Sequence, residues 1–407
     1  MQKMRKMKDS GIEWIGEIPE GWSIARGKHI LTLLQRAVFP TDGVITCFRD
    51  GEVTLRSNRR EDGFTVSLKE IGYQGIEPGD LVVHGMDGFA GSIGISDSRG
   101  KSSPVLVVLD SSQDKKYLMY YLRSMAYNNV FLALSTGIRV RSCDLKWNKL
   151  ADLLYLVPPI VEQHKLVSFL DEKCSEIDAM LSKTRASIEE YKKLKQAVIT
   201  QAVTTLNCPN IKLKYLMDII VDCPHETPIY TFTGNYLVIR TSDQSLASLR
   251  CDEYMYRLDE AEYKKRTRRL TLDKDDIVYG REGSWGLACL VPQSNKYCLG
   301  QRVMQFRCNT RLLYPKYAMY ALNSETVYMQ GALDTIGSTA PHVNISTICN
   351  YLLPVPALNE QKEITNYLDA KCAEIDKLIA KKEQLVKELE SYKKSLIYEV
   401  VTGKREV

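Results

Sequence analysis

The sequence predicts an α+β protein in which two mixed α/β globular domains alternate with two long helices that pair as an antiparallel coiled coil. Three observations predict this fold: a duplicated segment, a 4-3 spacing of apolar residues through both of its copies, and two turn-rich segments of similar size beside them. The predicted boundaries are 1–156, 157–206, 207–353 and 354–407, with the helices in the second and fourth parts.

The duplication is visible in one short phrase. The stretch LDEKCSEID at 170–178 returns at 368–376 as LDAKCAEID, with seven of nine positions identical. Extending this match without a gap aligns 156–205 with 354–403, and 17 of the 50 positions are identical. We therefore expect an internal pseudo-twofold duplication.

Each copy begins with prolines (VPPI and PVPA), which favour the first turn of a helix, and then contains no Gly or Pro for about forty residues. Apolar residues recur alternately at four and three positions, which is the seam of a coiled coil. The first helix leads from one domain to the next and the second can return, so an antiparallel pair is expected. The predicted helix seam consists of Leu170, Cys174, Ile177, Leu181, Ile188, Tyr191, Val198, Leu368, Cys372, Ile375, Ile379, Val386, Leu389, Leu396 and Val400.

Polar residues interrupt both seams at equivalent places, 184/382 and 195/393. Buried polar groups at such positions can fix the register of the two helices, or the lysine stems can extend to solvent. Cys174 and Cys372 lie on the seam, where a cysteine acts as a small buried hydrophobe or, less often, as a reactive or metal-binding thiol.

The two globular segments share a plan. Residues 77–96 and 273–292 each read as an acidic turn followed by a β-hairpin, and 115–125 and 315–325 read as helices. A polar loop follows each helix, at 135–142 and 335–344. The order is therefore globular part, long helix, globular part, long helix.

Composition limits the class of protein. No apolar run is long enough for a transmembrane helix, and the basic N-terminus lacks the apolar core of a signal peptide. The eleven cysteines include no C-x-x-C pair, so we expect neither a disulfide framework nor a structural zinc site, and a reducing cytoplasm is the natural setting. The net charge of +5 permits a nucleic-acid partner.

Basic residues concentrate in the globular parts, near predicted turns and strand ends. Arginine suits both bidentate contact with guanine and contact with phosphate, although each single arginine can also belong to a solvated surface. The candidate DNA-binding residues are Arg49, Arg56, Arg59, Arg60, Arg139, Arg141, Arg240, Lys264, Lys265, Arg266, Arg268, Arg269, Arg281, Arg302, Ser338 and His342. Within this set we expect Arg139 to affect which sequence is bound, and Lys265 to contribute uniformly as a phosphate contact.

Catalytic motifs are not apparent. GISDSRGKS at 94–102 has five residues between its glycines where a phosphate-binding loop has four, and VPPI at 157–160 lacks the residues that flank Pro-Pro in an amino-methyltransferase. EQK at 360–362 lacks the Pro-Asp of a nuclease centre. The five histidines show no metal-ligand spacing. The sequence predicts a non-catalytic chain without a metal or cofactor of its own.

Several phrases together resemble the specificity subunit of type I restriction–modification enzymes. They are DSGIEWIGEIPEGW (9–22), GDLVVHGMDGFAG (79–91), VPPIVEQHKLVSFLDEKCSEID (157–178), YLVIRTSD (236–243), DDIVYGREGSWG (275–286), PVPALNEQKEITNYLDAKCAEID (354–376) and YEVVTGK (398–404).

This resemblance implies that each globular part is a target-recognition domain that reads one half of a split, asymmetric DNA sequence, with the helices setting the unread gap. It also implies two methyltransferase subunits, which bind S-adenosylmethionine and methylate adenine, and motor–nuclease subunits that use ATP and Mg. Two alternatives stay open: a coiled-coil adaptor that binds protein partners, and an enzyme that fuses methyltransferase and nuclease.

Overall fold

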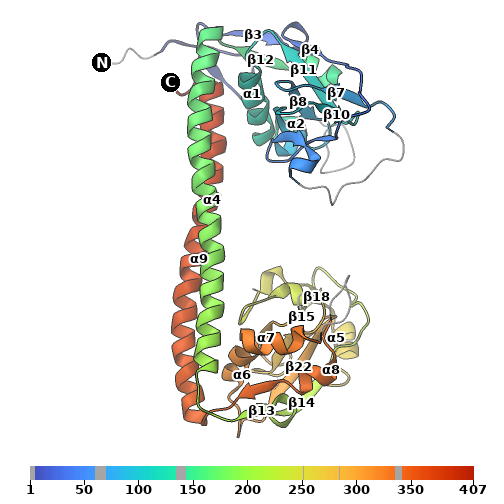
Figure 1. Ribbon diagram of the computed structural model, residues 1–407, viewed down its shortest axis with the longest axis vertical. Helices are drawn as coiled ribbons and strands as arrows, with labels where there is room; N and C mark the ends of the chain where they lie inside the picture. The colour runs from blue at the N-terminus through green and yellow to red at the C-terminus, as the bar shows by residue number, and fades with distance from the viewer. Residues whose placement is uncertain (1–4, 60–69, 134–143, 251, 284, 335–341) are drawn as a thin grey trace. The chain divides into compact units, whose positions relative to one another are not determined.

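The computed structural model describes the chain except for residues 1–4, 60–69, 134–143, 251, 284 and 335–341. The described residues form two compact units. The first comprises Met1–Lys183 and Leu385–Val407, and the second comprises Thr184–Gln384. Helices α4 (Ile160–Thr204) and α9 (Leu358–Val401) each contribute one part to either unit (Figure 1).

The first unit is built around a four-stranded antiparallel sheet of order β4-β11-β8-β9. Helix α1 (Lys115–Tyr127) packs on this sheet, and α2 (Val130–Ala133) and α3 (Trp147–Asp152) follow it in the chain. The central strands are β4 (Leu31–Leu33), β8 (Leu81–His84), β9 (Ile93–Ile95) and β11 (Leu106–Ser111). Four strand pairs surround them: β1 (Met7–Asp9) with β2 (Glu17–Pro19), β3 (Ser23–Arg26) with β12 (Leu154–Val157), β5 (Ile45–Cys47) with β6 (Val53–Leu55), and β7 (Gln74–Ile76) with β10 (Gly100–Ser102).

The second unit has a central sheet of the same design, of order β14-β22-β19-β20. Helices α6 (Pro315–Leu322), α7 (Glu325–Ala332) and α8 (Ile345–Cys349) follow it in the chain, and α5 (Glu260–Arg266) precedes β19. The central strands are β14 (Met217–Asp222), β19 (Ile277–Gly280), β20 (Ala288–Leu290) and β22 (Val303–Cys308). The remaining strands are β13 (Asn210–Lys212), β15 (Tyr236–Ile239), β16 (Gln244–Ser245), β17 (Ser248–Leu249), β18 (Arg257–Leu258), β21 (Tyr297–Leu299) and β23 (Leu352–Pro354).

Both predicted hairpins are present, and a buried carboxylate organises the acidic turn before each. In the first unit, Asp80 accepts a hydrogen bond from the backbone N–H of Glu77 at 2.8 Å and pairs with Arg36. In the second unit, Asp276 accepts from the N–H of Asp273, also at 2.8 Å, and pairs with Arg307. A carboxylate with such partners can be buried without leaving an unpaired charge.

The two long helices run antiparallel within each unit. In the first unit, Lys393 of α9 donates to Asp178 of α4 at 2.6 Å. In the second, Lys195 of α4 donates to Asp376 of α9 at 2.9 Å. These two ion pairs are equivalent under the 198-residue repeat, because 195 and 178 become 393 and 376. The predicted fold class, two mixed α/β domains with an antiparallel pair of long helices, is confirmed.

Each long helix is joined to its domain by the same set of contacts, which we call the helix joint. In the first unit it consists of Gln163, Tyr117, Tyr120, Lys116 and Asp171, and in the second of Gln361, Tyr317, Tyr320, Lys316 and Asp369. The two aspartates each accept from a tyrosine hydroxyl, at 2.8 Å and 2.9 Å, and from a lysine at 2.6 Å.

The glutamines are the buried centre of the helix joint. Gln163 is fully buried, donates to the carbonyl oxygen of Pro158 at 2.8 Å and accepts from the N–H of Asp114 at 3.0 Å. Gln361 is also fully buried, donates to Pro356 at 2.9 Å and accepts from the N–H of Tyr314 at 2.7 Å. Each side chain therefore connects the start of a long helix to the start of the helix that packs on the central sheet.

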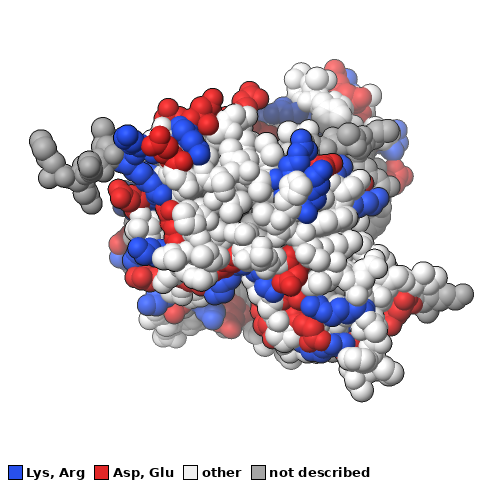
Figure 2. Space-filling model, turned by 90° about the horizontal axis from the view of Figure 1, so that it is seen from above, with Lys and Arg blue, Asp and Glu red and all other residues white. Residues whose placement is uncertain are grey.

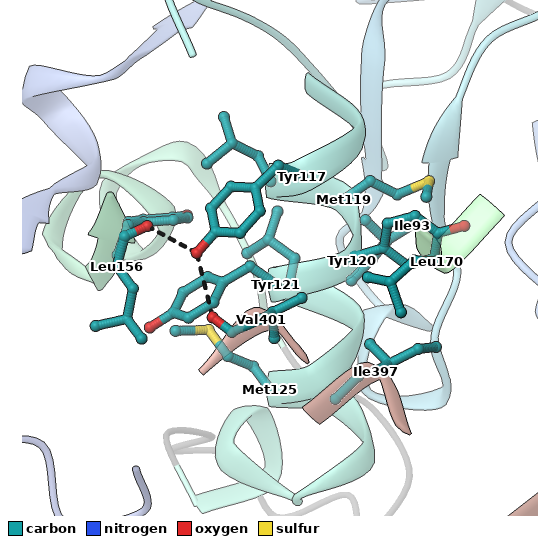
Figure 3. Close-up of a cluster of buried hydrophobic side chains, with 14 of the residues drawn as sticks. Ile93, Tyr117, Met119, Tyr120, Tyr121, Met125, Leu156, Leu170, Ile397 and Val401 are labelled. Carbon is teal, nitrogen blue, oxygen red and sulfur yellow. Dashed lines mark hydrogen bonds between the residues drawn. The ribbon is translucent and has the colours of Figure 1, made fainter. Parts of the chain in front are cut away.

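The apolar core of the first unit continues from the domain into both long helices. The hydroxyl of Tyr117 on α1 donates to the carbonyl oxygens of Leu156 and Val401, each at 3.2 Å (Figure 3). Leu170 of α4 and Ile397 of α9 belong to the same buried cluster. The C-terminal turn closes this cluster at Gly403, which has a φ of +72° and lies so close to Pro19 that a Cβ would approach it to 2.4 Å. A residue with a side chain cannot replace this glycine without moving the N-terminal segment.

Replacing Gln361 by Ala is expected to lower the free energy of unfolding by about 2–4 kcal/mol, because it removes the partner of the half-buried Tyr314 N–H and of the carbonyl oxygens of Pro356 and Leu312. Gln163→Ala should have a similar effect. The measurement is urea unfolding of the full chain, with exposed Gln201→Ala as the matched control. Equal stability of Gln361→Ala and Gln201→Ala would contradict the assigned role of the helix joint.

Candidate nucleic-acid interface

Loops from three central strands meet at one end of the sheet in the second unit, at Asp222, Gly280 and Val303. We call this the distal sheet end, because the helix joint follows the opposite end of β22. The corresponding end in the first unit lies at Leu33, His84 and Leu106. Loops that follow strands supply polar side chains without interrupting the buried sheet, so these ends are suited to binding.

In the second unit the distal sheet end holds Arg281, Arg302 and His342, all predicted from the sequence. Arg281 is buried and pairs with Asp222 at 3.3 Å and with Glu282 at 2.7 Å. Arg302 is exposed and has a φ of +70°. His342 is half-buried and forms a β-bridge with Glu282. The sheet therefore brings these three residues together although they are far apart in the chain.

His225 belongs to the same group and was not predicted. Its Nε2 lies 3.1 Å from Oδ2 of Asp222, and its side chain is exposed. Gln301 donates to the carbonyl oxygen of His225 at 3.3 Å and to the hydroxyl of Thr227 at 3.0 Å. Only the strand order could have indicated this cluster, because His225, Arg281, Arg302 and His342 come from four separate loops.

The basic helix α5 divides into a structural and an exposed part. Arg266 is buried and donates to the carbonyl oxygens of Leu299 and Glu226, at 3.0 Å to each. Lys264 and Lys265 are exposed and pair with Glu260 at 2.6 Å and with Glu226 at 2.8 Å. Arg268 and Arg269 follow the helix, are exposed, and form no ion pair with any residue that the structure describes. They are the cations of this group that are free to meet a phosphate.

Arg240 is held by neighbours in its own unit. Its guanidinium donates to both carboxylate oxygens of Asp243 at 2.8 Å and lies 3.9 Å from the ring centroid of Tyr256. The hydrogen bonds that Arg240 donates to Asp243 raise the pKa of Arg240 above its ordinary value. A bidentate pair of this kind fixes the direction of the arginine.

In the first unit, three of the predicted arginines lie in the described part of the chain. Arg49 and Arg56 line a pocket of about 430 Å³ together with His84. Arg49 pairs with Asp87 at 3.1 Å, and Arg56 donates to the hydroxyl of Thr46 at 3.3 Å. Arg59 pairs with Asp50 at 2.6 Å. Arg60, Arg139, Arg141 and Ser338 lie outside the described residues.

The His84 side chain accepts hydrogen bonds from the backbone in this pocket. Its Nδ1 accepts from the backbone N–H of Asp87 at 3.0 Å, and burial lowers the pKa of the histidine. On the face drawn in Figure 2, lysine and arginine side chains are interspersed with acidic ones. The candidate interface is defined by the position and pairing of particular residues.

The predicted seam residues are mostly buried, and the seam shifts where the helices meet the domain cores. Leu170, Cys174, Ile177, Leu181, Ile188, Leu368, Cys372, Ile375, Leu396 and Val400 are buried, whereas Tyr191, Val198, Ile379, Val386 and Leu389 are half-buried. Ile199 and Val203 are fully buried beside Val198, because they face the core of the second unit. Cys174 and Cys372 lie in the buried apolar clusters, and burial raises the pKa of both thiols, which disfavours the reactive thiolate.

Other classes of site are not evident in the residues described. No three His, Cys, Asp or Glu side chains among them are grouped so as to hold a metal ion. Nor does any helix in that part of the chain have the length and apolar character needed to cross a membrane.

Comparison with known proteins identifies relatives of one kind. Residues 223–388 match the family model Methylase_S, described as the type I restriction modification DNA specificity domain. The predicted resemblance to type I specificity subunits is confirmed. The two curated relatives given below are described as specificity subunits, in agreement with the prediction of a non-catalytic chain.

Two curated relatives are the EcoBI specificity subunit of Escherichia coli, 26% identical over 130 residues, and the EcoKI specificity subunit of Escherichia coli K12, 23% identical over 211 residues. The matches cover 32% and 46% of this chain and span 27% and 44% of those relatives' own lengths.

Two solved structures share the fold. One is a chain from a study of complex assembly and conformational transition in the type I R-M system, with a TM-score of 0.70 and 15% identity, covering 95% of this chain and 99% of that one. The other is the HsdS subunit of Thermoanaerobacter tengcongensis, with a TM-score of 0.50 and 14% identity, covering 98% and 100%.

Arg266→Ala is expected to lower the free energy of unfolding by about 2–4 kcal/mol, because several buried carbonyl oxygens lose their donor. Exposed Arg268→Ala should change stability by less than about 0.5 kcal/mol. If Arg268 contacts a phosphate, its loss should reduce the slope of log K against log salt by about one. The measurements are urea unfolding and DNA binding at several salt concentrations. A stable Arg266→Ala variant that fails only in DNA binding would contradict this division of roles.

Proposed function

We propose that this chain is the DNA-specificity subunit of a type I restriction–modification complex. Residues 1–156 and 207–353 are target-recognition domains, and 157–206 and 354–407 are the helical spacers between them. Each domain reads one half of an asymmetric, bipartite DNA target. The observation that carries this proposal is the duplicated helix joint, since two like domains are fastened in equivalent ways to two paired helices.

The physical argument concerns geometry. A domain that binds a short half-site is weak alone, but a second domain on the same rigid support makes the second contact intramolecular. Because the distance between readers is fixed by their support, the spacing of half-sites becomes part of the specificity. The ion pairs Lys195–Asp376 and Lys393–Asp178 support a fixed register of the two helices.

The distal sheet ends are the proposed DNA-contacting regions. In the second domain, exposed Arg302 and His225 can donate to base edges or phosphates, and Arg268 and Arg269 can contact the backbone. In the first domain, Arg49, Arg56 and Arg59 occupy the corresponding region, with the predicted Arg60, Arg139 and Arg141 beyond the described residues.

The chemistry belongs to partners in this proposal. Two methyltransferase subunits that bind S-adenosylmethionine dock on the helical spacers and methylate adenine, and motor–nuclease subunits use ATP and Mg to cleave. This chain contributes recognition and positioning, and it requires no cofactor of its own.

Expression of this chain with its methyltransferase subunit in a host without DNA methylation should create a split, asymmetric motif with methyladenine on opposite strands in its two halves. The measurement is modification-sensitive sequencing of the host genome. Assembly of both subunits must be verified independently by copurification. An assembled complex that creates no motif, and a chain whose binding to duplex DNA is insensitive to salt, would favour a protein-binding adaptor over this function.

A seven-residue helical insertion after Lys183, combined with one after Gln384, should lengthen the unread gap and leave both half-sites unchanged. Seven residues preserve the 4-3 seam and add roughly 10 Å at 1.5 Å per residue. At 3.4 Å per base pair this corresponds to about three base pairs. The measurement is again the methylome. An insertion in α4 alone is the control, since it shifts one seam against the other and should abolish methylation. New bases within a half-site would refute the spacer role.

A further inference from the structure

Two phenylalanines stand out by their exposure. The chain has eight phenylalanines, and seven lie in the described residues, since Phe64 does not. Of these seven, only Phe39 and Phe232 are exposed, Phe39 to 52% and Phe232 fully. Exposed apolar rings are unfavourable in water, so two such rings in similar places indicate a use.

The two rings occupy equivalent loops. Phe39 follows β4 and precedes β5, and Phe232 follows β14 and precedes β15. Strands β4 and β14 are the same edge strand of the two central sheets. The strands that follow these loops, β5 and β15, are also equivalent. Val44, just before β5, forms a parallel bridge with Lys101 of β10, and β15 pairs in parallel with β21. The sequences of these loops differ, so the similarity lies in position.

The loop that carries Phe232 is held by backbone contacts on both sides of the ring. The N–H of Thr231 donates to the carbonyl oxygen of Arg257 at 2.9 Å, and Arg257 donates to the carbonyl oxygen of Gly234 at 3.2 Å. Gly234 lies against the backbone of Leu258, where a Cβ would approach the carbonyl oxygen to 2.0 Å. Only glycine permits this close approach, so the ring is held outward by a defined turn.

An aromatic stack also holds the loop that carries Phe232. The ring of Tyr230 stacks on the ring of Tyr256, with centroids 4.4 Å apart. The guanidinium of Arg240 lies over the Tyr256 ring and is itself held by Asp243. A preorganised loop loses little conformational entropy when it binds.

The loop that carries Phe39 is fixed by different residues. The N–H of Phe39 donates to Asp42 at 2.8 Å, and Asp42 accepts from Arg99 at 3.2 Å. The Arg99 guanidinium also lies 4.3 Å from the centroid of the Phe39 ring and pairs with Glu77. Each domain thus holds one phenylalanine outward beside an arginine.

We propose that Phe39 and Phe232 are apolar wedges, each of which enters a groove of its own half-site and inserts between two adjacent base pairs. This rests on the proposed function, since it requires that both domains bind DNA. Inserted apolar side chains partly unstack a base step and kink the duplex. Of the neighbouring arginines, Arg257 forms no ion pair with a described residue and provides positive charge for a phosphate backbone, whereas Arg99 is already paired with Asp42 and Glu77.

Duplex DNA suits the rings because each domain holds one exposed phenylalanine among the described residues, which matches a target with two halves. Phe232 lies beside other exposed apolar side chains, Ile229, Tyr230 and Tyr256, so a contact with a protein partner is made an outcome of the test. A wedge favours flexible pyrimidine–purine steps, so each half-site should contain such a step where the ring inserts.

The test uses the assembled complex and the duplex identified by the methylome, with 2-aminopurine placed in turn at each step of both half-sites. Wild-type protein should raise the fluorescence several-fold at one step in each half-site. Phe232→Ala should abolish the rise in one half-site only, and Phe39→Ala in the other. Phe232→Leu should retain part of the rise. Each Ala variant should bind about tenfold more weakly with an unchanged salt slope, because no phosphate contact is lost.

Tyr215→Ala is the matched control. This exposed tyrosine precedes β14, whereas Phe232 follows that strand, so it lies at the opposite end of the sheet. It should change neither fluorescence nor affinity. Unfolding curves of all variants should match the wild type, since the rings are exposed.

The outcomes separate the two proposals. Specific binding by the wild type without a fluorescence rise, or a rise that survives both Ala variants, overturns the wedge and leaves the specificity role intact. Loss of methyltransferase association in Phe232→Ala, with the fluorescence unchanged, assigns the ring to a protein interface instead. A wild-type complex that binds no duplex in a salt-dependent manner overturns the specificity role and the wedge together.

Discussion

The buried glutamine at the start of each long helix is the interaction on which the rest of the structure depends. Gln163 and Gln361 are inside the protein, where an amide must have partners for both its oxygen and its nitrogen. Those partners are backbone groups of two different elements, the proline segment before the long helix and the start of the helix on the sheet. The glutamine can be satisfied only if these elements meet at one place. It therefore fixes how each helix leaves its domain, and Asp171 and Asp369, about two turns later, reinforce the same direction.

The duplication has a physical explanation in the contacts between its copies. Lys195 of the first copy pairs with Asp376 of the second, and Lys393 of the second pairs with Asp178 of the first. Lys195 is buried along its stem, so an alternative register would place its ammonium group without a carboxylate in an apolar seam. In an antiparallel pair each copy supplies both a donor and an acceptor, and the same residues serve twice. This accounts for the identity of these lysines and aspartates in the two copies.

The sequence was sufficient to predict the elements that depend on periodicity and local turns. The 4-3 seam, the two hairpins and the order of domains follow from patterns that a single chain displays. The outer ends of the seam could not be predicted in detail, because Ile199 and Val203 belong to a cluster that combines the domain core with Leu368 and Cys372 of the partner helix. Basic residues were similarly ambiguous. Nothing local distinguishes buried Arg266, which holds backbone carbonyls, from exposed Arg268 two residues later. His225 and Phe232 required the strand order, since only the sheet brings their loop to the same end as Gly280 and Val303.

Each domain therefore has two ends under different constraints. At the end that follows β11 and β22, every contact of the helix joint is present in both units, because the long helices must be held in the same way twice. At the distal sheet end the backbone plan is kept while its side chains differ: Asp42 and Arg99 fix one exposed phenylalanine, and Arg257, Gly234 and an aromatic stack fix the other. A surface that only had to be solvated would have no reason to hold an apolar ring outward by two unrelated sets of contacts. If each domain presents its phenylalanine to a different DNA half-site, the ring must have the same place in both folds, while the residues that hold its loop can differ.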